Sequence, residues 1–193
     1  MLSSKNSLKV LKKTNALLEG HFVLSSGLHS GYYVQCAKLL SYPKLSSKFV
    51  NSLAQKIKKK IKKIDIILSP AMGGIIIGYE IGRLLGKETI FCERENKEFK
   101  LRRGFSIKKN SRVLIVEDVI TTGKSSLECV KIIKKYKSKL VGFACLIDRT
   151  QTNKIKQKII SQIKLDIPTY KKKNLPINLK KIPITKPGSR FLK

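Results

Sequence analysis

The spacing of hydrophobic residues predicts helices and strands that alternate between residues 43 and 148. Apolar residues three or four positions apart indicate helices at 43–64, 73–86 and 124–136. Short unbroken apolar runs indicate strands at 65–70, 88–93, 112–117 and 140–148. Strands that are apolar on both faces and alternate with helices are typical of a parallel sheet covered on both sides. We therefore predict an α/β fold with an open, mainly parallel sheet and helices on both faces.

The pattern is weaker on either side of this region. Residues 7–19 have helical apolar spacing, and 20–36 is typical of two short strands around a Ser/Gly turn. After residue 150 the sequence indicates a helix near 154–160, a strand near 161–167 and an extended tail that contains prolines. A chain of 193 residues is long enough for one domain with a full hydrophobic core and short for two.

The composition is that of a globular protein without a membrane span. Hydrophobic residues make up 41% of the chain, and no apolar run approaches the ~20 residues that cross a bilayer. The cysteines form no C-x-x-C pair, and no histidine stands close to any of them: Cys36, Cys92, Cys129 and Cys145. Buried, reduced thiols are typical of such spacing, so we expect a cytoplasmic protein without membrane contact.

The formal net charge of +30 leaves two interpretations open. Of the 42 basic residues 35 are lysines, spread along nearly the whole chain with much isoleucine and asparagine, which also use A/T-rich codons. Genome-wide codon bias explains this pattern without a function. The alternative is attraction for polyanions, at least non-specifically at low salt. A specific nucleic-acid site usually concentrates charge on one face and favours arginine, so we expect no specific nucleic-acid partner.

Acidic residues are scarce, yet two stand side by side in "VLIVEDVITTGKSS" (113–126), where a buried strand ends. After Glu117 and Asp118, the loop "TTGKSS" offers backbone N–H groups, hydroxyls and a glycine at a helix start, which suits a phosphate. A P-loop is excluded, because Asp118 stands where its first glycine would be. Carboxylates accept hydrogen bonds from sugar hydroxyls, so a ribose 5-phosphate fits the whole segment. The alternative is an ordinary strand-to-helix turn with a solvated acidic pair.

This segment resembles the phosphoribosyl pyrophosphate signature of type I phosphoribosyltransferases. Other segments resemble the orotate phosphoribosyltransferase family in chain order. They match its N-terminal hood, its pyrophosphate loop, its mobile catalytic loop and the strand end with its orotate-binding arginine: "FVLSSGLHSGYY" (22–33), "SPAMGGIIIG" (69–78), "ERENKEFKLRRGF" (93–105) and "LIDR" (146–149). Together the matches extend from about residue 20 to 150.

The resemblance implies an enzyme that transfers the 5-phosphoribosyl group from phosphoribosyl pyrophosphate to orotate in pyrimidine biosynthesis. It implies Mg²⁺ as cofactor, bound mainly through the substrate rather than by protein ligands. It also implies a homodimer in which one chain's loop serves the neighbour's site. A single domain over 1–193 then has its core at about 43–150 and a small hood from about 1–42 and 160–193.

The resemblance also assigns roles to single residues. Glu117 and Asp118 hold the ribose hydroxyls. The rest of the signature binds phosphoribosyl pyrophosphate: Val119, Ile120, Thr121, Thr122, Gly123, Lys124 and Ser125. Thr121 also reaches orotate, and Arg149 pairs with it, because a guanidinium matches a carboxylate or imide edge. Gly73 and Gly74 let backbone amides approach the pyrophosphate.

The resemblance also implies that the mobile loop supplies cations for the leaving group. Arg94 matches the arginine that opens this loop in the family. This sequence has Ser25 and Glu95 where relatives often have lysine, and it lacks the loop histidine of many relatives. The remaining candidates for contact with pyrophosphate are Lys97, Lys100, Arg102 and Arg103.

Simpler interpretations and other functions stay open at this point. Taken alone, the basic loop is typical of a solvated hairpin, Arg149 of a surface residue at a strand end, and Gly73-Gly74 of a helix entry. Two alternative functions are a purine-type phosphoribosyltransferase and an RNA-binding regulator with the same fold. Orotate binding separates the first from the prediction, and a salt-resistant RNA affinity without turnover indicates the second.

Overall fold

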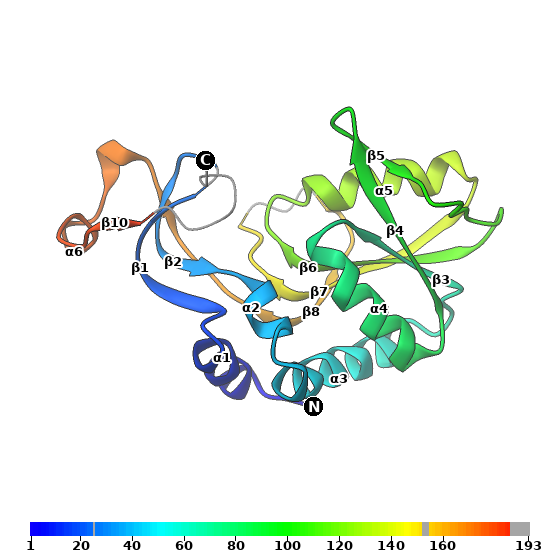
Figure 1. Cartoon of the computed structure of the whole chain (residues 1–193), viewed down its shortest axis with the longest axis horizontal. Helices are drawn as coiled ribbons and strands as arrows, with labels where there is room; N and C mark the ends of the chain where they lie inside the picture. Colours follow the sequence, from blue (N-terminus) through cyan, green and yellow to red (C-terminus); the bar gives the residue numbers. More distant parts are fainter. Residues whose placement is uncertain (25, 152–154, 186–193) are drawn as a thin grey trace.

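The structure is a computed structural model that describes residues 1–24, 26–151 and 155–185 (Figure 1). Its larger sheet, the core sheet, has the strand order β5-β4-β3-β6-β7-β8. These strands are β3 (Ile66–Pro70), β4 (Glu88–Glu95), β5 (Glu98–Leu101), β6 (Arg112–Ile120), β7 (Lys139–Asp148) and β8 (Ile159–Lys164). Every pairing is parallel except that of β5 with β4. The predicted α/β fold with a mainly parallel sheet is confirmed.

Helices cover both faces of the core sheet, as predicted. On one face α3 (Pro43–Lys60) and α4 (Gly73–Leu85) pack against the sheet in a cluster that includes Ile67. On the other face α5 (Lys124–Lys135) packs in a second cluster that includes Leu68. Successive strand residues therefore serve opposite clusters, which is why the strands are apolar without interruption. No helix in the described part of the chain is both long and apolar enough to cross a bilayer.

A second, smaller sheet, the hood sheet, lies beside the core sheet (Figure 1). Its order is β10-β1-β2-β9, built from β1 (Leu17–Val23), β2 (His29–Val34), β9 (Thr169–Tyr170) and β10 (Ile184–Thr185). The short helices α1 (Ser4–Lys13), α2 (Cys36–Leu40), η1 (Lys172–Asn174) and α6 (Ile177–Lys180) complete the chain. The boundary expected at residue 160 falls inside β8, which belongs to the core sheet.

The predicted helix over 7–19 is wrong in its second half. α1 ends at Lys13, where the Thr14 hydroxyl bonds back to the Val10 carbonyl (2.9 Å) and Asn15 takes a positive φ of 52°. Leu17 and the residue after it, which fit the helical spacing, instead begin β1. A short apolar repeat fits the helical period and the strand period equally well. Pairing with β2 makes this segment a strand.

The predictions for two further helices also need correction. α3 ends at Lys60, so the buried Ile64 follows the helix instead of extending it. The helix expected near 154–160 is wrong where it is described, because Ile159 and Ile160 form β8 and pair with β7. Isoleucine is β-branched and favours strands. Here one isoleucine packs into the apolar cluster on each face of the core sheet, which stabilises the strand. Residues 152–154 and Ser25 lie outside the described residues.

Candidate active site

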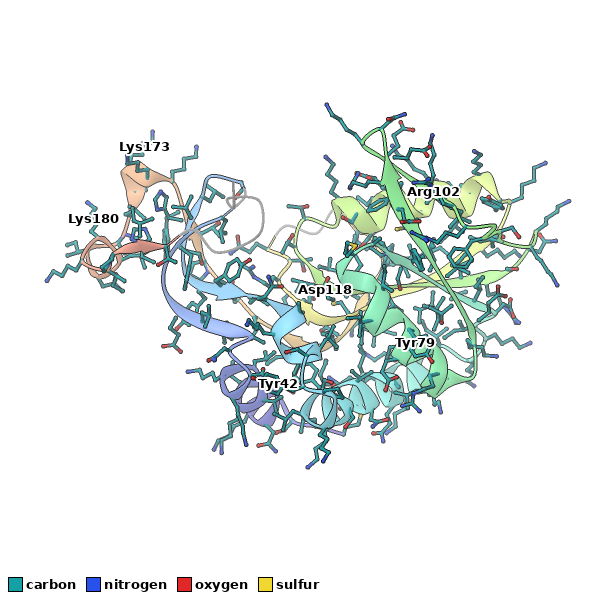
Figure 2. The ribbon with its side chains drawn as sticks, in the orientation of Figure 1. Tyr42, Tyr79, Arg102, Asp118, Lys173 and Lys180 are labelled. Atoms are coloured by element: carbon teal, nitrogen blue, oxygen red, sulfur yellow. The ribbon has the colours of Figure 1, made fainter. Side chains whose placement is uncertain are left out.

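Three loops meet at one edge of the core sheet, as the parallel strands require. β6 lies between β3 and β7, and all three point the same way. Their carboxyl ends carry the loop before α4, the loop 121–123 and Arg149 respectively. Asp118 lies in the middle of the molecule in Figure 2, close to the start of α4. The predicted pyrophosphate loop, phosphate loop and orotate arginine therefore share one edge.

The two acidic residues point to opposite sides of β6. Glu117 is only 7% exposed and accepts a hydrogen bond from the Ser126 hydroxyl of α5. The half-buried carboxylate of Asp118 lies instead against the start of α4, where a Cβ on Gly73 would stand 2.7 Å from Asp118 Oδ2. The pair therefore lies across the strand, with one acid towards each helix layer. A ligand that contacts both must span the end of β6.

Burial raises the pKa of both acids. The pKa of Glu117 is raised to about 7 by burial and by the charge of Asp118, although the Ser126 hydroxyl opposes the change. Burial also raises the pKa of Asp118, against hydrogen bonds from backbone amides. Among the described residues neither carboxylate forms a salt bridge. Both groups are therefore more stable with a partner that donates hydrogen bonds or positive charge.

The loop after β6 has the geometry of an anion site. Thr121 and Thr122 are exposed, Gly123 has a φ of 72°, and α5 begins at Lys124. A side chain at Gly123 is excluded by its φ and by Ile155, whose Cδ1 would lie 2.8 Å from a Cβ. Exposed hydroxyls beside the first amides of a 12-residue helix suit a phosphate. β6 continues to Ile120, so Val119 and Ile120 belong to the strand and only 121–123 form the turn.

Gly73 and Gly74 are required by contacts within the chain. A Cβ at Gly73 would collide with the Asp118 carboxylate, and one at Gly74 would lie 3.1 Å from the carbonyl oxygen of Val116. α4 therefore starts directly against β6, and the preceding Ala71–Met72 peptide bond is cis. The arrangement brings the first residues of α4 beside Asp118. Their predicted contact with pyrophosphate stays a prediction.

Arg149 lies directly after β7, and one of its side-chain donors is unpaired among the described residues. Its backbone N–H donates to the carbonyl of Ile120 (2.9 Å), which holds it beside the first residue of the phosphate loop. Its Nε is buried and has no hydrogen-bond partner in the described part of the chain. Burial lowers the pKa of this guanidinium. A buried, unpaired donor is unfavourable and indicates that a ligand supplies the acceptor.

The charged segment 94–105 is a β-hairpin in the structure. β4 and β5 pair around a turn at Asn96 and Lys97, both with positive φ, and Phe99 packs into the α5 cluster. The sequence did not predict β5 as a strand, although Glu98–Leu101 alternates charged and apolar residues, because the run is only four residues long. Tertiary packing of Phe99 fixes the hairpin.

The cations of this hairpin pair with its own acids and with α5. Arg94 lies 2.8 Å from Glu128 and stacks on Phe99 with its Cζ 4.0 Å from the ring centre. The other ion pairs of this segment among the described residues are Lys100–Glu95 at 2.7 Å, Arg102–Glu95 at 3.6 Å and Arg103–Glu93 at 2.8 Å. Lys97 is exposed, and Arg102 lies far from Asp118 in Figure 2. The structure therefore does not bring these cations to the acidic pair within one chain.

Two residues beside the site had no predicted role. Ser126, which bonds to Glu117, belongs to the buried face of α5 with Cys129 and Ile133, so helical spacing carried that signal. The buried thiol of Cys36 donates to the backbone carbonyl of Asp118 (3.7 Å). No pattern in the sequence links Cys36 to Asp118, which lies 82 positions away.

Comparison with known proteins gives a consistent picture. A family model described as the phosphoribosyl transferase domain matches residues 42–180. An orotate phosphoribosyltransferase of Erythrobacter litoralis is 43% identical over 191 residues, which are 98% of this chain and 99% of that protein.

Two solved structures extend the comparison. The orotate phosphoribosyltransferase of Aeropyrum pernix superposes with a TM-score of 0.72 at 26% identity, over 81% of this chain and 92% of that one. An adenine phosphoribosyltransferase of Thermoanaerobacter pseudethanolicus gives a TM-score of 0.62 at 19% identity, over 69% of this chain and 88% of that one. The second likeness concerns the fold alone.

Proposed function

This chain belongs to the orotate phosphoribosyltransferase family, and on that premise we propose that it transfers the 5-phosphoribosyl group from phosphoribosyl pyrophosphate to orotate. The products are orotidine 5′-phosphate and pyrophosphate, and the step belongs to pyrimidine biosynthesis. The purine-type and RNA-binding alternatives are not favoured, because the 43% identity to an orotate enzyme covers nearly the whole chain.

The observation that carries this function is the unpaired guanidinium donor of Arg149 beside the phosphate loop. Orotate has a carboxylate and imide oxygens, which are acceptors for such a donor. The bond from Arg149 N–H to Ile120 fixes the distance between this donor and the loop that begins at Thr121. Arg149 therefore suits the base, and the loop suits the 5-phosphate, at the two ends of the product orotidine 5′-phosphate.

The acidic pair suits the sugar between these ends. Ribose hydroxyls donate hydrogen bonds to the carboxylates of Glu117 and Asp118, which have no salt-bridge partner in the described part of the chain. As the bond to pyrophosphate breaks, positive charge develops on the sugar ring. Pairing with a ligand favours the charged form of these carboxylates, and negative side chains already held in position then stabilise the developing charge with little reorganisation. The acids therefore bind the sugar and favour its cationic transition state.

We propose Mg²⁺ as the cofactor, bound mainly through the substrate. No cluster of three or more histidine, cysteine or acidic side chains among the described residues is placed to hold a metal ion. Two carboxylates at the sheet edge nevertheless fit Mg²⁺, which proteins usually bind through one or two carboxylates, waters and substrate phosphates. When bound, the ion neutralises charge on the leaving pyrophosphate. Glu117 and Asp118 are the residues that would help to hold it.

We further propose a homodimer that shares its sites. Met72, just before α4, and Ile76 and Tyr79 on α4 form an apolar stripe and are 83%, 57% and 65% exposed. Figure 2 labels Tyr79 on this helix. These residues lie one helical turn apart on one face, and such a face is usually covered by a partner. α4 starts at the acidic pair, so a second copy on this stripe stands next to the site. Its β4–β5 hairpin then supplies the cations that the site lacks within its own chain.

A cytoplasmic location is part of the proposal. All four cysteines are free and buried: Cys36, Cys92, Cys129 and Cys145. Burial raises the pKa of Cys36 and Cys145, which keeps these thiols protonated and unreactive. Free thiols of this kind are typical of a reducing compartment.

A spectroscopic assay with orotate, phosphoribosyl pyrophosphate and Mg²⁺ tests the activity. We expect the orotate absorbance to fall as the nucleotide forms, and pyrophosphate to appear in equal amount. Adenine in place of orotate is the matched control and should give no product. Turnover with adenine and none with orotate would contradict the proposal.

A further inference from the structure

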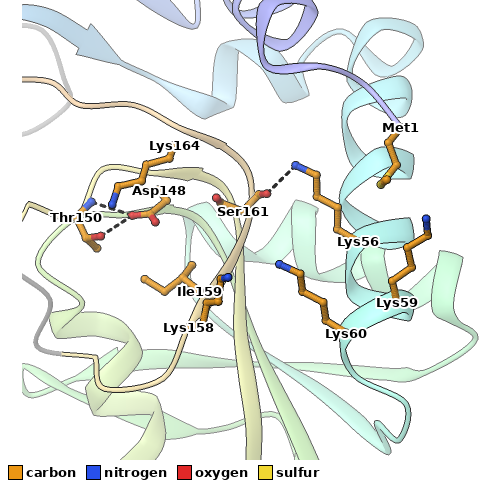
Figure 3. Close-up of a pocket in the computed structure, with 10 residues that line it drawn as sticks. All are labelled: Met1, Lys56, Lys59, Lys60, Asp148, Thr150, Lys158, Ile159, Ser161 and Lys164. Carbon is orange, nitrogen blue, oxygen red and sulfur yellow. Dashed lines mark hydrogen bonds between the residues drawn. The ribbon is translucent and has the colours of Figure 1, made fainter.

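A cavity of about 560 Å³ lies between α3 and the edge strand β8 (Figure 3), and its lining includes Asp148 and Thr150 on either side of Arg149 but not Arg149 itself. α3 contributes lysines from its last turns, and β8 and the residue before it contribute lysines from the opposite side. Asp148, at the end of β7, also lines the cavity. None of the residues proposed to bind phosphoribosyl pyrophosphate or orotate belongs to the lining.

The lining concentrates positive charge. Half of its ten residues are lysines, against 35 of 193 in the whole chain: Lys56, Lys59, Lys60, Lys158 and Lys164. Codon bias explains a high lysine content but not this local enrichment. Asp148 is the acidic residue of the lining, and its carboxylate already accepts bonds from the Thr150 N–H (2.9 Å) and hydroxyl (2.7 Å).

One of these lysines has a structural partner, and the others do not. Lys56 donates to the backbone carbonyls of Ser161 (3.0 Å) and Gln162 (2.7 Å), so it caps the open edge of β8. Burial and the charge of Lys60 lower the pKa of Lys56. The side chains of the other four form no hydrogen bond or salt bridge to residues that the structure describes. Figure 3 shows Lys56 and Lys60 extending from α3 towards β8.

Like charges gathered around one cavity repel each other, and a compact anion with several charges removes that repulsion. None of the lining residues is aromatic, so a nucleobase finds no ring on which to stack. Phosphate oxygens accept hydrogen bonds from ammonium groups, and a chain of phosphates carries several charges in a small volume. We propose that this cavity binds a polyphosphate chain, either free or as part of a nucleoside triphosphate.

Isothermal titration with tripolyphosphate at low and moderate salt tests this site. The cavity variant replaces Lys60, Lys158 and Lys164 by glutamine and leaves the structural Lys56 in place. The matched control replaces Lys131, Lys134 and Lys135, which lie on α5 and are exposed, and so removes the same charge elsewhere. We expect the Kd of the cavity variant to rise about tenfold or more and that of the control to change by less than about threefold, because screened charges act locally.

The outcomes separate the possibilities. Equal weakening in both variants would show an effect of net charge, and no weakening in either would place the binding elsewhere, for example at the phosphate loop; each overturns the proposal. A nucleoside triphosphate should bind about as tightly as tripolyphosphate, and binding of the nucleotide alone would contradict recognition of the phosphate chain. Thermal unfolding and orotate turnover of the cavity variant should match wild type. These two measurements keep failure of this site distinct from failure of the proposed activity.

Discussion

At the end of β6, Glu117 is buried and Asp118 half-buried, and neither has a cationic partner among the described residues. In the β4–β5 hairpin, by contrast, Glu93 and Glu95 are paired and accessible to water. The same residue types therefore have opposite pKa shifts. A hydrogen bond from Arg103 lowers the pKa of Glu93, and one from Lys100 lowers that of Glu95. Burial raises the pKa of Glu117 and of Asp118.

The comparison separates two ways of preparing charge for a reaction. The acids of β6 are held in a fixed, unfavourable position, so a ligand that pairs with them gains the stability that the free protein lacks. The hairpin charges satisfy one another through exposed pairs worth only ~0–1 kcal/mol each. Such pairs exchange partners at little cost. This suits a segment whose cations are proposed to leave their acidic partners and bind pyrophosphate.

Removing the fixed charge of Asp118 should have the largest effect. We expect Asp118→Asn to keep the fold and to lower turnover about 10²-fold or more, because a preorganised charge near the ribose is lost. Steady-state kinetics with circular dichroism as the folding control measure this. Wild-type turnover in a folded variant would remove the role in ribose binding assigned to Asp118.

The unpaired donor of Arg149 should control the affinity for the acceptor base. Arg149→Ala should raise the KM for orotate by about 30-fold or more, since a lost charge-assisted pair costs ~2–5 kcal/mol. The KM for phosphoribosyl pyrophosphate should change much less. Equal changes in both constants would mean that Arg149 has a structural role.

The buried acids should make the free protein less stable as the pH rises. The folded pKa of Glu117 is about 7, above its ordinary value of 4.5, so the folded state binds the proton more tightly than the unfolded state. For this group, stability is highest below pH 4.5 and falls as the pH rises through about 7, by roughly 3 kcal/mol in total. Asp118 acts in the same direction.

Urea unfolding across this pH range measures the effect. The difference between wild type and Glu117→Gln isolates the contribution of Glu117, because other titrating groups cancel. A wild-type stability that falls no more steeply than that of the variant would contradict the raised pKa.

Mixing two inactive chains should restore part of the activity if the hairpin serves the partner's site. A chain with Arg94→Ala and a chain with Asp118→Asn form hybrid dimers with one intact site, so about a quarter of wild-type activity is expected from random pairing of equal amounts. Subunit exchange is checked by mass spectrometry. Confirmed exchange without any return of activity would show that the hairpin acts within its own chain.

The smallest effect should come from the pairs within the hairpin. Glu95→Gln breaks the contacts with Lys100 and Arg102, yet should change the free energy of unfolding by less than about 1 kcal/mol. Glu80→Gln, which breaks the exposed pair with Arg83 on α4, is the matched control. A much larger loss for Glu95 would show that the hairpin is a rigid element.

The sequence by itself determined the layers and the order of the site. Continuous apolar strands alternating with amphipathic helices are local signals, and they predicted the parallel sheet, the acids at the end of β6 and the glycines at the starts of α4 and α5. Gly123 could be assigned to the turn from the sequence alone, because glycine is the residue that most readily takes the positive φ that such turns need. The structure gives it a positive φ.

Only the tertiary structure decided what those residues contact. It placed Glu117 against Ser126 and Asp118 against Gly73. It also left a donor of Arg149 without a partner among the described residues and placed Ile159 in an edge strand. Each of these depends on segments far apart in the chain. Burial and pairing set the pKa of a carboxylate and the choice between helix and strand, and neither is encoded in the spacing of nearby residues.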